Sequence, residues 1–213
     1  MIIKKIGIVC SLIICLFSLV ISFDAQTINK RIIIDPGHGG RDGGATANNI
    51  NEAKLNLEIS LVLKEVFEEN GYEVVLTRDN DDDLCDGKFI KKEDMNKRIS
   101  LINNKNNLLC ISIHQNVFSL ATYKGAQVFY NDNNNINKAL ALSIQNSLKY
   151  YLNNTERSIS KRNNIYILNK VTIPMVLVEC GFLSNLTEAN LLKDYFYQKK
   201  LAYSIYYGCV SFI

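Results

Sequence analysis

The chain has 213 residues, of which 47% are hydrophobic and 21% are charged, and its formal net charge is +3. This length suits one well-buried domain and is short for two, and so small a positive charge does not indicate a nucleic-acid partner. The cysteines form no Cys-x-x-Cys pair, and a domain of this size does not require disulfides. We therefore expect the four cysteines beyond the first 26 residues to be free: Cys85, Cys110, Cys180 and Cys209.

Residues 1–26 differ in character from the rest of the chain. Lys4 and Lys5 precede an uncharged, mainly apolar run that extends from Ile6 to Phe23, which is typical of an export signal. The run is also long enough to span a bilayer. We expect residues 1–26 to be a signal peptide or an N-terminal membrane anchor, and to be the only segment that meets a membrane. Residues 30–213 are then the exported folded domain.

Apolar runs and amphipathic segments alternate through residues 30–213. Helical spacing is clearest where Leu55, Ile59, Val62 and Val66 recur at three and four residues, ahead of Gly71. In chain order the pattern predicts a strand at 31–35, a glycine-rich loop, a helix at 51–70, a strand at 72–78, a helix at 91–102, strands at 108–114 and 125–130, a helix at 135–152, strands at 165–168 and 174–179, and one or two helices over 187–212. This order predicts a single α/β domain with a mainly parallel sheet of about six strands and helices on both faces.

Groups that bind protons or metal ions follow three of these strands. The first strand runs into Asp35 and His38, the third into His114, and the last into Glu179. In open α/β sheets, ligands bind in the crevice beyond the carboxyl ends of the strands. We therefore expect these side chains to lie close together.

Glu52, near the start of the first helix, has two interpretations. A carboxylate at this place commonly interacts with the helix dipole. Glu52 also lies three residues before Leu55 and seven before Ile59, on the stripe that faces the sheet. If Glu52 points inward, the preceding loop places it near His38.

The chain has only two histidines, His38 and His114, which restricts the kind of metal site that it can form. A catalytic zinc site uses three protein ligands and keeps one position open, so a site with three histidines is impossible here. The third ligand would be a carboxylate or a cysteine, and two histidines with Glu52 are a set found in hydrolytic zinc enzymes. Glu179 would then be available for proton transfer.

Other polar groups near these positions have alternative roles. Asp35 either accepts a ring proton from a histidine ligand or caps its turn. Arg78 and Arg98 either bind a substrate carboxylate or hold loops through ion pairs, and we favour the structural role. The acidic segment 79–87 lacks the glycine and glutamate of a calcium-binding EF-hand loop, so we expect a solvated loop. A cysteine hydrolase built on Cys180 and His114 would leave His38 and Glu52 without a function.

Six motifs give a resemblance to a known family: "IIIDPGHGGRDGGA", "NEAKLNL", "LTR", "KRISLIN", "ISIHQN" and "VLVECGFLSN". Over residues 30–213 the chain resembles the zinc-dependent N-acetylmuramoyl-L-alanine amidases of the bacterial cell wall. The resemblance implies His38, Glu52 and His114 as zinc ligands and Glu179 as the catalytic carboxylate. The chain departs from the family at Gln115, where an alanine or another small residue is more common.

The resemblance also implies a substrate and a cellular role. The substrate would be peptidoglycan, hydrolysed between N-acetylmuramic acid and L-alanine. The chain is most similar to the sporulation cortex amidases of endospore formers, which help to make muramic lactam. A vegetative wall amidase, a zinc peptidase acting on another wall bond and a non-catalytic wall-binding protein are the alternatives. Location would be the cell wall or the forespore intermembrane space.

Some relatives carry an autoinhibitory helix between the positions of His114 and Glu179. That interval is short in this sequence, so we expect no such built-in plug. Control would then come from expression, location, or an activating or localising protein partner.

Overall fold

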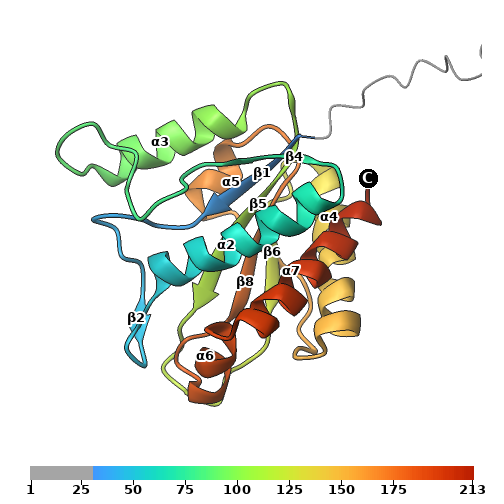
Figure 1. The fold of residues 1–213 in the computed structure, drawn as a ribbon. Coiled ribbons are helices and arrows are strands. Elements are labelled where there is room, and N and C mark those ends of the chain that lie inside the picture. The colour runs from blue at the N-terminus through green and yellow to red at the C-terminus, as the bar shows by residue number, and fades with distance from the viewer. Residues whose placement is uncertain (1–30) are drawn as a thin grey trace, which may run out of the picture.

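The computed structural model describes residues 31–213, so the expected signal or anchor at residues 1–26 lies outside the described part of the chain. A six-stranded sheet with the order β4-β1-β5-β8-β6-β7 forms the centre of a single α/β domain (Figure 1). The strands are β1 Arg31–Pro36, β4 Glu73–Leu76, β5 Asn107–Asn116, β6 Gln127–Tyr130, β7 Ser160–Lys161 and β8 Met175–Phe182. The prediction of an α/β domain around a six-stranded sheet is confirmed.

The sheet is mainly parallel, as expected. β1 pairs in parallel with both β4 and β5, and β5 pairs in parallel with β8. β6 runs antiparallel to β8, and β7 is parallel to β6 at the edge. The carboxyl ends of β1, β5 and β8 therefore meet at the same side of the sheet.

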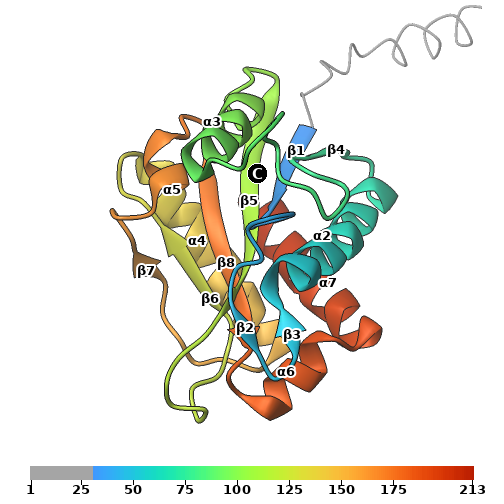
Figure 2. The same ribbon diagram turned by 90° about the vertical axis from the view of Figure 1, so that its left-hand side faces the viewer.

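Helices cover both faces of the sheet (Figures 1 and 2). One face packs against α2, α4 and α7, and the other packs against α3 and α5. The helices are α2 Glu52–Glu69, α3 Lys91–Ile102, α4 Asn135–Ser147, α5 Tyr166–Lys170, α6 Leu186–Leu192 and α7 Tyr195–Val210. Of the one or two helices expected over 187–212, the structure has two, α6 and α7.

Strand periodicity explains the two-sided core. Ile32 and Ile34 contribute to the cluster beneath α2, α4 and α7, whereas Ile33, between them, faces α3 and α5. All three side chains are at most 1% exposed. Because successive strand residues point to opposite faces, an unbroken apolar run such as "III" indicates a strand that is covered on both sides.

Three local predictions were wrong. Residues 165–168 do not form a strand, since α5 begins at Tyr166 and the edge position belongs to β7. Periodicity does not separate a strand from a helical turn in so short an apolar run. The glycine-rich loop contains a small hairpin of β2 Thr46–Ala47 and β3 Ile50–Asn51, and the helix at 135–152 ends in a π-helical turn, Leu148–Leu152.

The cysteine prediction is confirmed. Cys85, Cys110, Cys180 and Cys209 are all free, and Cys110 is a fully buried core residue. Across residues 31–213, no helix combines the length and the apolar character needed to cross a membrane.

Candidate metal centre

The loop after β1 presents His38 in an unusual backbone conformation. His38 has a φ of 61°, and Gly39 and Gly40 also have positive φ values, of 135° and 56°. The left-handed region is uncommon for a residue with a side chain, and such residues concentrate at functional sites. A pair of backbone hydrogen bonds between Gly39 and Asp42 closes the turn. The loop thereby directs the imidazole back over the sheet edge.

Two buried arginines hold this loop in place. Arg98 is 0% exposed and donates hydrogen bonds to the carbonyls of Pro36 and His38. Arg78 is 5% exposed and donates to the carbonyls of Pro36, Gly37 and Ala53. Their guanidinium groups are occupied by the protein itself, so both arginines have the structural role that we favoured. Arg98 forms the expected ion pairs, with Asp35 and Asp94, whereas Arg78 holds the loop through hydrogen bonds to carbonyl groups instead.

Asp35 has neither of the two roles expected for it. Its carboxylate accepts hydrogen bonds from Thr77 Oγ1 at 2.6 Å, from Ser112 Oγ at 2.7 Å and from Arg98 Nη1 at 2.9 Å. Burial by itself would raise the pKa of Asp35, but Arg98 and the hydroxyl donors outweigh it and leave the pKa below its usual value. Asp35 is the anchor for Arg98, and Arg98 fixes the His38 loop.

Glu52 is the first residue of α2 and points into the site. Its side chain is 5% exposed, and Asn51 caps the helix in its place by accepting a hydrogen bond from the backbone of Lys54. Glu52 Oε2 accepts a hydrogen bond from the backbone of Ala45 at 2.8 Å, and Oε1 accepts one from the backbone of Gln115 at 3.2 Å. The carboxylate is therefore fixed in orientation, and the inward interpretation of Glu52 is the one that the structure shows.

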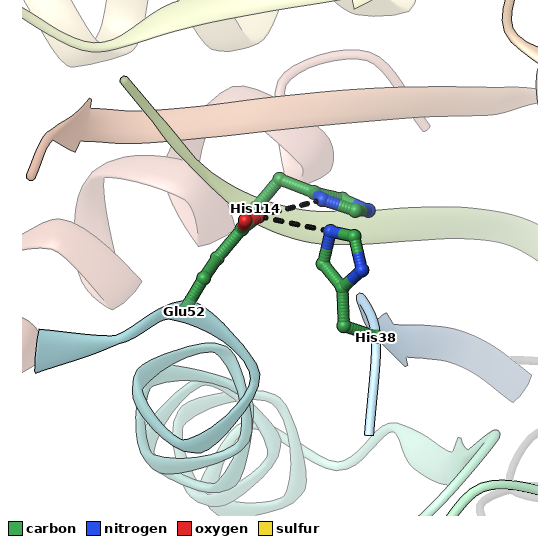
Figure 3. Close-up of side chains that lie close together, drawn as sticks. All are labelled: His38, Glu52 and His114. Atoms are coloured by element: carbon green, nitrogen blue, oxygen red, sulfur yellow. Dashed lines mark hydrogen bonds and ion pairs between the residues drawn. The ribbon is translucent and has the colours of Figure 1, made fainter. Parts of the chain in front are cut away.

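His38, Glu52 and His114 converge at the carboxyl edge of the sheet (Figure 3). Glu52 Oε1 lies 3.3 Å from His38 Nε2 and 3.0 Å from His114 Nδ1. One donor atom from each of the three side chains lies within 4.8 Å of the others. Residues distant in sequence, from a loop, a helix start and a strand, thus form one cluster.

Small residues make the cluster possible. A Cβ atom added to Gly37 would lie 2.3 Å from His114 Nε2, well inside contact distance. A Cβ on Gly44 would lie 2.7 Å from both Glu52 Oε2 and His38 Cδ2. Any side chain at Gly37 would therefore displace His114, which explains one glycine of the "DPGHGG" motif.

The cluster fits a zinc ion. Zinc bonds of about 2.0–2.2 Å to nitrogen and oxygen in a tetrahedron place neighbouring donors about 3.4 Å apart, close to the 3.0 and 3.3 Å found here.

The electrostatics of the cluster also favour a cation. Burial lowers the pKa of His38, but Glu52 and Asp42 more than reverse this effect and raise it. Burial raises the pKa of Glu52, yet hydrogen bonds from His114 and His38 hold it far below its usual value.

Glu179 lies beside this cluster on β8, opposite His114 in the parallel β5–β8 register. Burial raises the pKa of Glu179 to about 7, and the Glu52 carboxylate adds to this rise although His114 opposes it. Its Oε2 atom is buried and has no hydrogen-bond partner. Buried polar atoms are nearly always paired, so an unpaired carboxylate oxygen marks a functional candidate.

A cavity of about 600 Å³ opens onto these groups from the α3–α5 side of the sheet. His38, His114 and Glu179 line its inner part. The first turns of α3 and α5 form its walls, and Tyr166 of α5 donates a hydrogen bond to Asn96 Oδ1 of α3 at 3.0 Å. The cluster is therefore accessible to a substrate.

Asp42 is a site residue that sequence reasoning missed. Its Oδ2 lies 3.0 Å from His38 Nδ1, the ring nitrogen that faces away from Glu52, and 3.3 Å from Lys91 Nζ. Histidine ligands commonly bind a carboxylate through their second nitrogen, and this fixes the ring. The only signal in the sequence was an aspartate four residues after the histidine. The direction of the Asp42 side chain depends on the Gly39–Asp42 turn, which the sequence pattern did not predict.

The remaining sequence candidates do not belong to the cluster. Cys180 is 0% exposed in the core beneath α2, α4 and α7, and burial raises the pKa of its thiol well above the ordinary value, which rules out a cysteine nucleophile. Gln115 is buried and donates a hydrogen bond to Asn56 Oδ1, so it supports α2. The 79–87 segment is a loop, as predicted, and its Asp83 binds Arg41 of the His38 loop.

Comparisons with known proteins agree with this arrangement. The family model described as N-acetylmuramoyl-L-alanine amidase matches residues 32–210. The chain is 40% identical over 188 residues to the germination-specific N-acetylmuramoyl-L-alanine amidase of Bacillus subtilis (strain 168), which covers 86% of this chain and 79% of the relative. It is 32% identical over 187 residues to N-acetylmuramoyl-L-alanine amidase LytC of the same strain, which covers 87% of this chain and 36% of LytC.

A solved structure shows the same fold. The CwlD amidase from Clostridioides difficile, determined in complex with the GerS lipoprotein, superposes with a TM-score of 0.80 at 38% sequence identity. The match covers 86% of this chain and 98% of that one.

Proposed function

The chain belongs to the N-acetylmuramoyl-L-alanine amidase family and is a peptidoglycan amidase, and on this premise we propose that it is zinc-dependent. His38, Glu52 and His114 would hold the ion, and Glu179 would be the catalytic carboxylate. The observation that carries this proposal is the unpaired Oε2 atom of Glu179, which lies beside three convergent ligand side chains.

The scissile bond is the amide between the lactyl carbonyl of N-acetylmuramic acid and the nitrogen of L-alanine. When bound, a zinc ion would lower the pKa of water from 15.7 to about 7 and polarise the scissile carbonyl. Glu179 would accept the proton from the attacking water and deliver it to the departing alanine nitrogen. In the metal-free chain burial raises the pKa of Glu179 to about 7, and a carboxylate with a raised pKa accepts a proton more readily than an exposed one.

The rest of the site positions these groups. Asp42 would hold the His38 ring through Nδ1 while Nε2 faces the ion. Arg98, tied to Asp35, would keep the loop backbone from relaxing when substrate binds. Preorganisation of this kind lowers the cost of reaching the reactive geometry.

The proposed cellular role is maturation of the spore cortex, where removal of stem peptides leads to muramic lactam. The 40% identity to an amidase named germination-specific supports this role. The relative LytC, at 32% identity, supports vegetative wall as the alternative substrate.

We further propose that the chain is exported, with residues 1–26 as signal peptide or membrane anchor, and that it acts in the wall or the forespore intermembrane space. The complex of the CwlD amidase with a lipoprotein supports an activating or localising protein partner for this chain.

Digestion of peptidoglycan tests the reaction and the substrate together. The purified chain, with zinc, is incubated with vegetative wall and with spore cortex precursor wall, and the released ends are identified by mass spectrometry. We expect free L-alanine amino termini, with faster release from the cortex material. Other new termini would indicate a peptidase, no release would indicate a binding protein, and faster release from vegetative wall would overturn the cortex role.

A further inference from the structure

The outer part of the active-site cavity has a composition that the chemistry of hydrolysis does not explain. Lys91 and Lys92, the first residues of α3, line it together with His38 and Glu179. The α5 side of the cavity contributes Ile165, which precedes the helix, and Ile167 of its first turn. The outer cavity is therefore cationic along one wall and apolar along another.

The positive charge of this wall is only partly cancelled by nearby acids, since Asp42, which also lines the cavity, pairs with only one of the two lysines, Lys91. Glu93 binds Lys97 and Asp94 binds Arg98, so the acidic residues in the first turn of α3 are already paired. Lys91 shares Asp42 with His38, whereas no ion pair of Lys92 is found within residues 31–213.

The start of α3 adds to this positive potential. Ile90 occupies the N-cap position and provides no side-chain hydrogen bond. The amino-terminal end of a helix carries a partial positive charge. An anionic group in the outer cavity would therefore meet the two ammonium groups and the helix end together.

The proposed substrate carries a carboxylate close to its scissile bond. In peptidoglycan, L-alanine is followed by a D-glutamyl residue that is linked through its side chain and keeps a free α-carboxylate. Because consecutive residues are spaced about 3.8 Å apart, this carboxylate lies roughly 7 Å beyond the scissile nitrogen. Lys91 Nζ is 3.3 Å from Asp42 Oδ2, which is itself 3.0 Å from His38 Nδ1. Lys91 is thus about one residue of substrate away from the ligand cluster, and Lys92 follows it at the start of α3 and lines the same cavity.

We propose that the cavity between α3 and α5 is the stem-peptide subsite, and that Lys91 and Lys92 recognise the free carboxylate of the D-glutamyl residue after the scissile bond. This inference rests on the proposed function. Charge-assisted contacts between ammonium and carboxylate groups give strong and selective recognition. The subsite therefore makes the enzyme selective for peptides in which this carboxylate is not amidated.

A pair of matched substrates tests the proposal. N-acetylmuramoyl-L-alanyl-D-glutamate and its D-isoglutamine counterpart differ only in that the carboxylate is a neutral amide. Values of kcat/KM are measured for both with the zinc-loaded wild-type chain, the K91Q/K92Q variant and the control K97Q. Lys97 lies on the same helix, and its replacement removes one positive charge where the double variant removes two, but it does not line the cavity.

We expect the wild type and K97Q to prefer the acid substrate by about tenfold, mainly through KM, and K91Q/K92Q to lose this preference. The ratio compares two substrates on one enzyme, so any effect of Lys91 on His38 through Asp42 cancels. Equal rates of the wild type on both substrates, or a preference that survives in K91Q/K92Q, would overturn the proposal. Release from neither substrate by the wild type would instead overturn the proposed function, and the inference with it.

Discussion

Glu179 stands directly opposite His114 in the parallel register of β8 with β5. The pairing fixes the distance between the proposed base and a proposed metal ligand through backbone hydrogen bonds, without help from any loop. The register also places Cys180 on the opposite face, because successive strand residues alternate. The sheet therefore determines which of two adjacent reactive side chains meets the substrate.

Replacing Glu179 by glutamine should separate catalysis from metal binding. The amide keeps the size of the side chain but cannot accept the proton of the attacking water, so we expect kcat to fall by roughly 10²–10⁴-fold. Zinc content, measured by atomic emission, should remain near that of the wild type. In the His38→Ala variant both activity and zinc should be lost. An active E179Q variant would remove Glu179 from the mechanism.

Gly37→Ala should disturb His114 without changing any polar group. The new methyl would lie 2.3 Å from the His114 ring, so the ring must move out of the cluster. We expect weaker zinc binding and a loss of activity of at least tenfold. Gly87→Ala is the matched control, since nothing lies within 4 Å of a Cβ there. Equal zinc affinities for the two variants would show that the close approach is unimportant.

Arg98→Gln should destabilise the fold strongly. It leaves the buried carboxylates of Asp35 and Asp94 without their charged partner, and breaking a buried pair costs about 3–5 kcal/mol. Arg31→Gln breaks an ion pair with Glu73 in which both side chains are partly exposed, and should cost about 1 kcal/mol or less. Urea unfolding measures both. Similar costs for the two variants would contradict the anchoring role of Arg98.

The raised pKa of Glu179 predicts a pH-dependent stability of the metal-free protein. The folded state holds the proton up to about pH 7, whereas an unfolded glutamate releases it near 4.5. Folding therefore becomes less favourable as pH rises from about 4.5 to 7, by about 3 kcal/mol at most. In the E179Q variant this change is absent, so its stability relative to the wild type should increase between pH 5 and pH 8. The free energy of unfolding of both proteins is measured at each pH. A constant difference between wild type and E179Q from pH 5 to pH 8 would show that the pKa of Glu179 is not raised.

Much of the site could be predicted because its residues follow buried strands. Parallel strands bring their carboxyl ends to one edge, so His38, His114 and Glu179 were expected together, and the presence of only two histidines pointed to Glu52. This prediction required only the order of the elements and the chemistry of the side chains.

The groups that support the site could not be predicted in the same manner. Asp42 reaches His38 because the Gly39–Asp42 turn directs it there. Asp35 meets Arg98 across 63 residues, a contact that only the tertiary packing creates. The edge strand was also misplaced, because the apolar run at 165–168 is too short for its periodicity to distinguish a strand from a turn of helix.

The most direct measurement of the central claim is hydrolysis of peptidoglycan by the folded chain before and after exhaustive chelation. We predict that activity disappears when the metal is removed and returns when one equivalent of zinc per chain is added back, with circular dichroism confirming that the fold is retained throughout. Undiminished hydrolysis by a folded, metal-free chain would contradict the account.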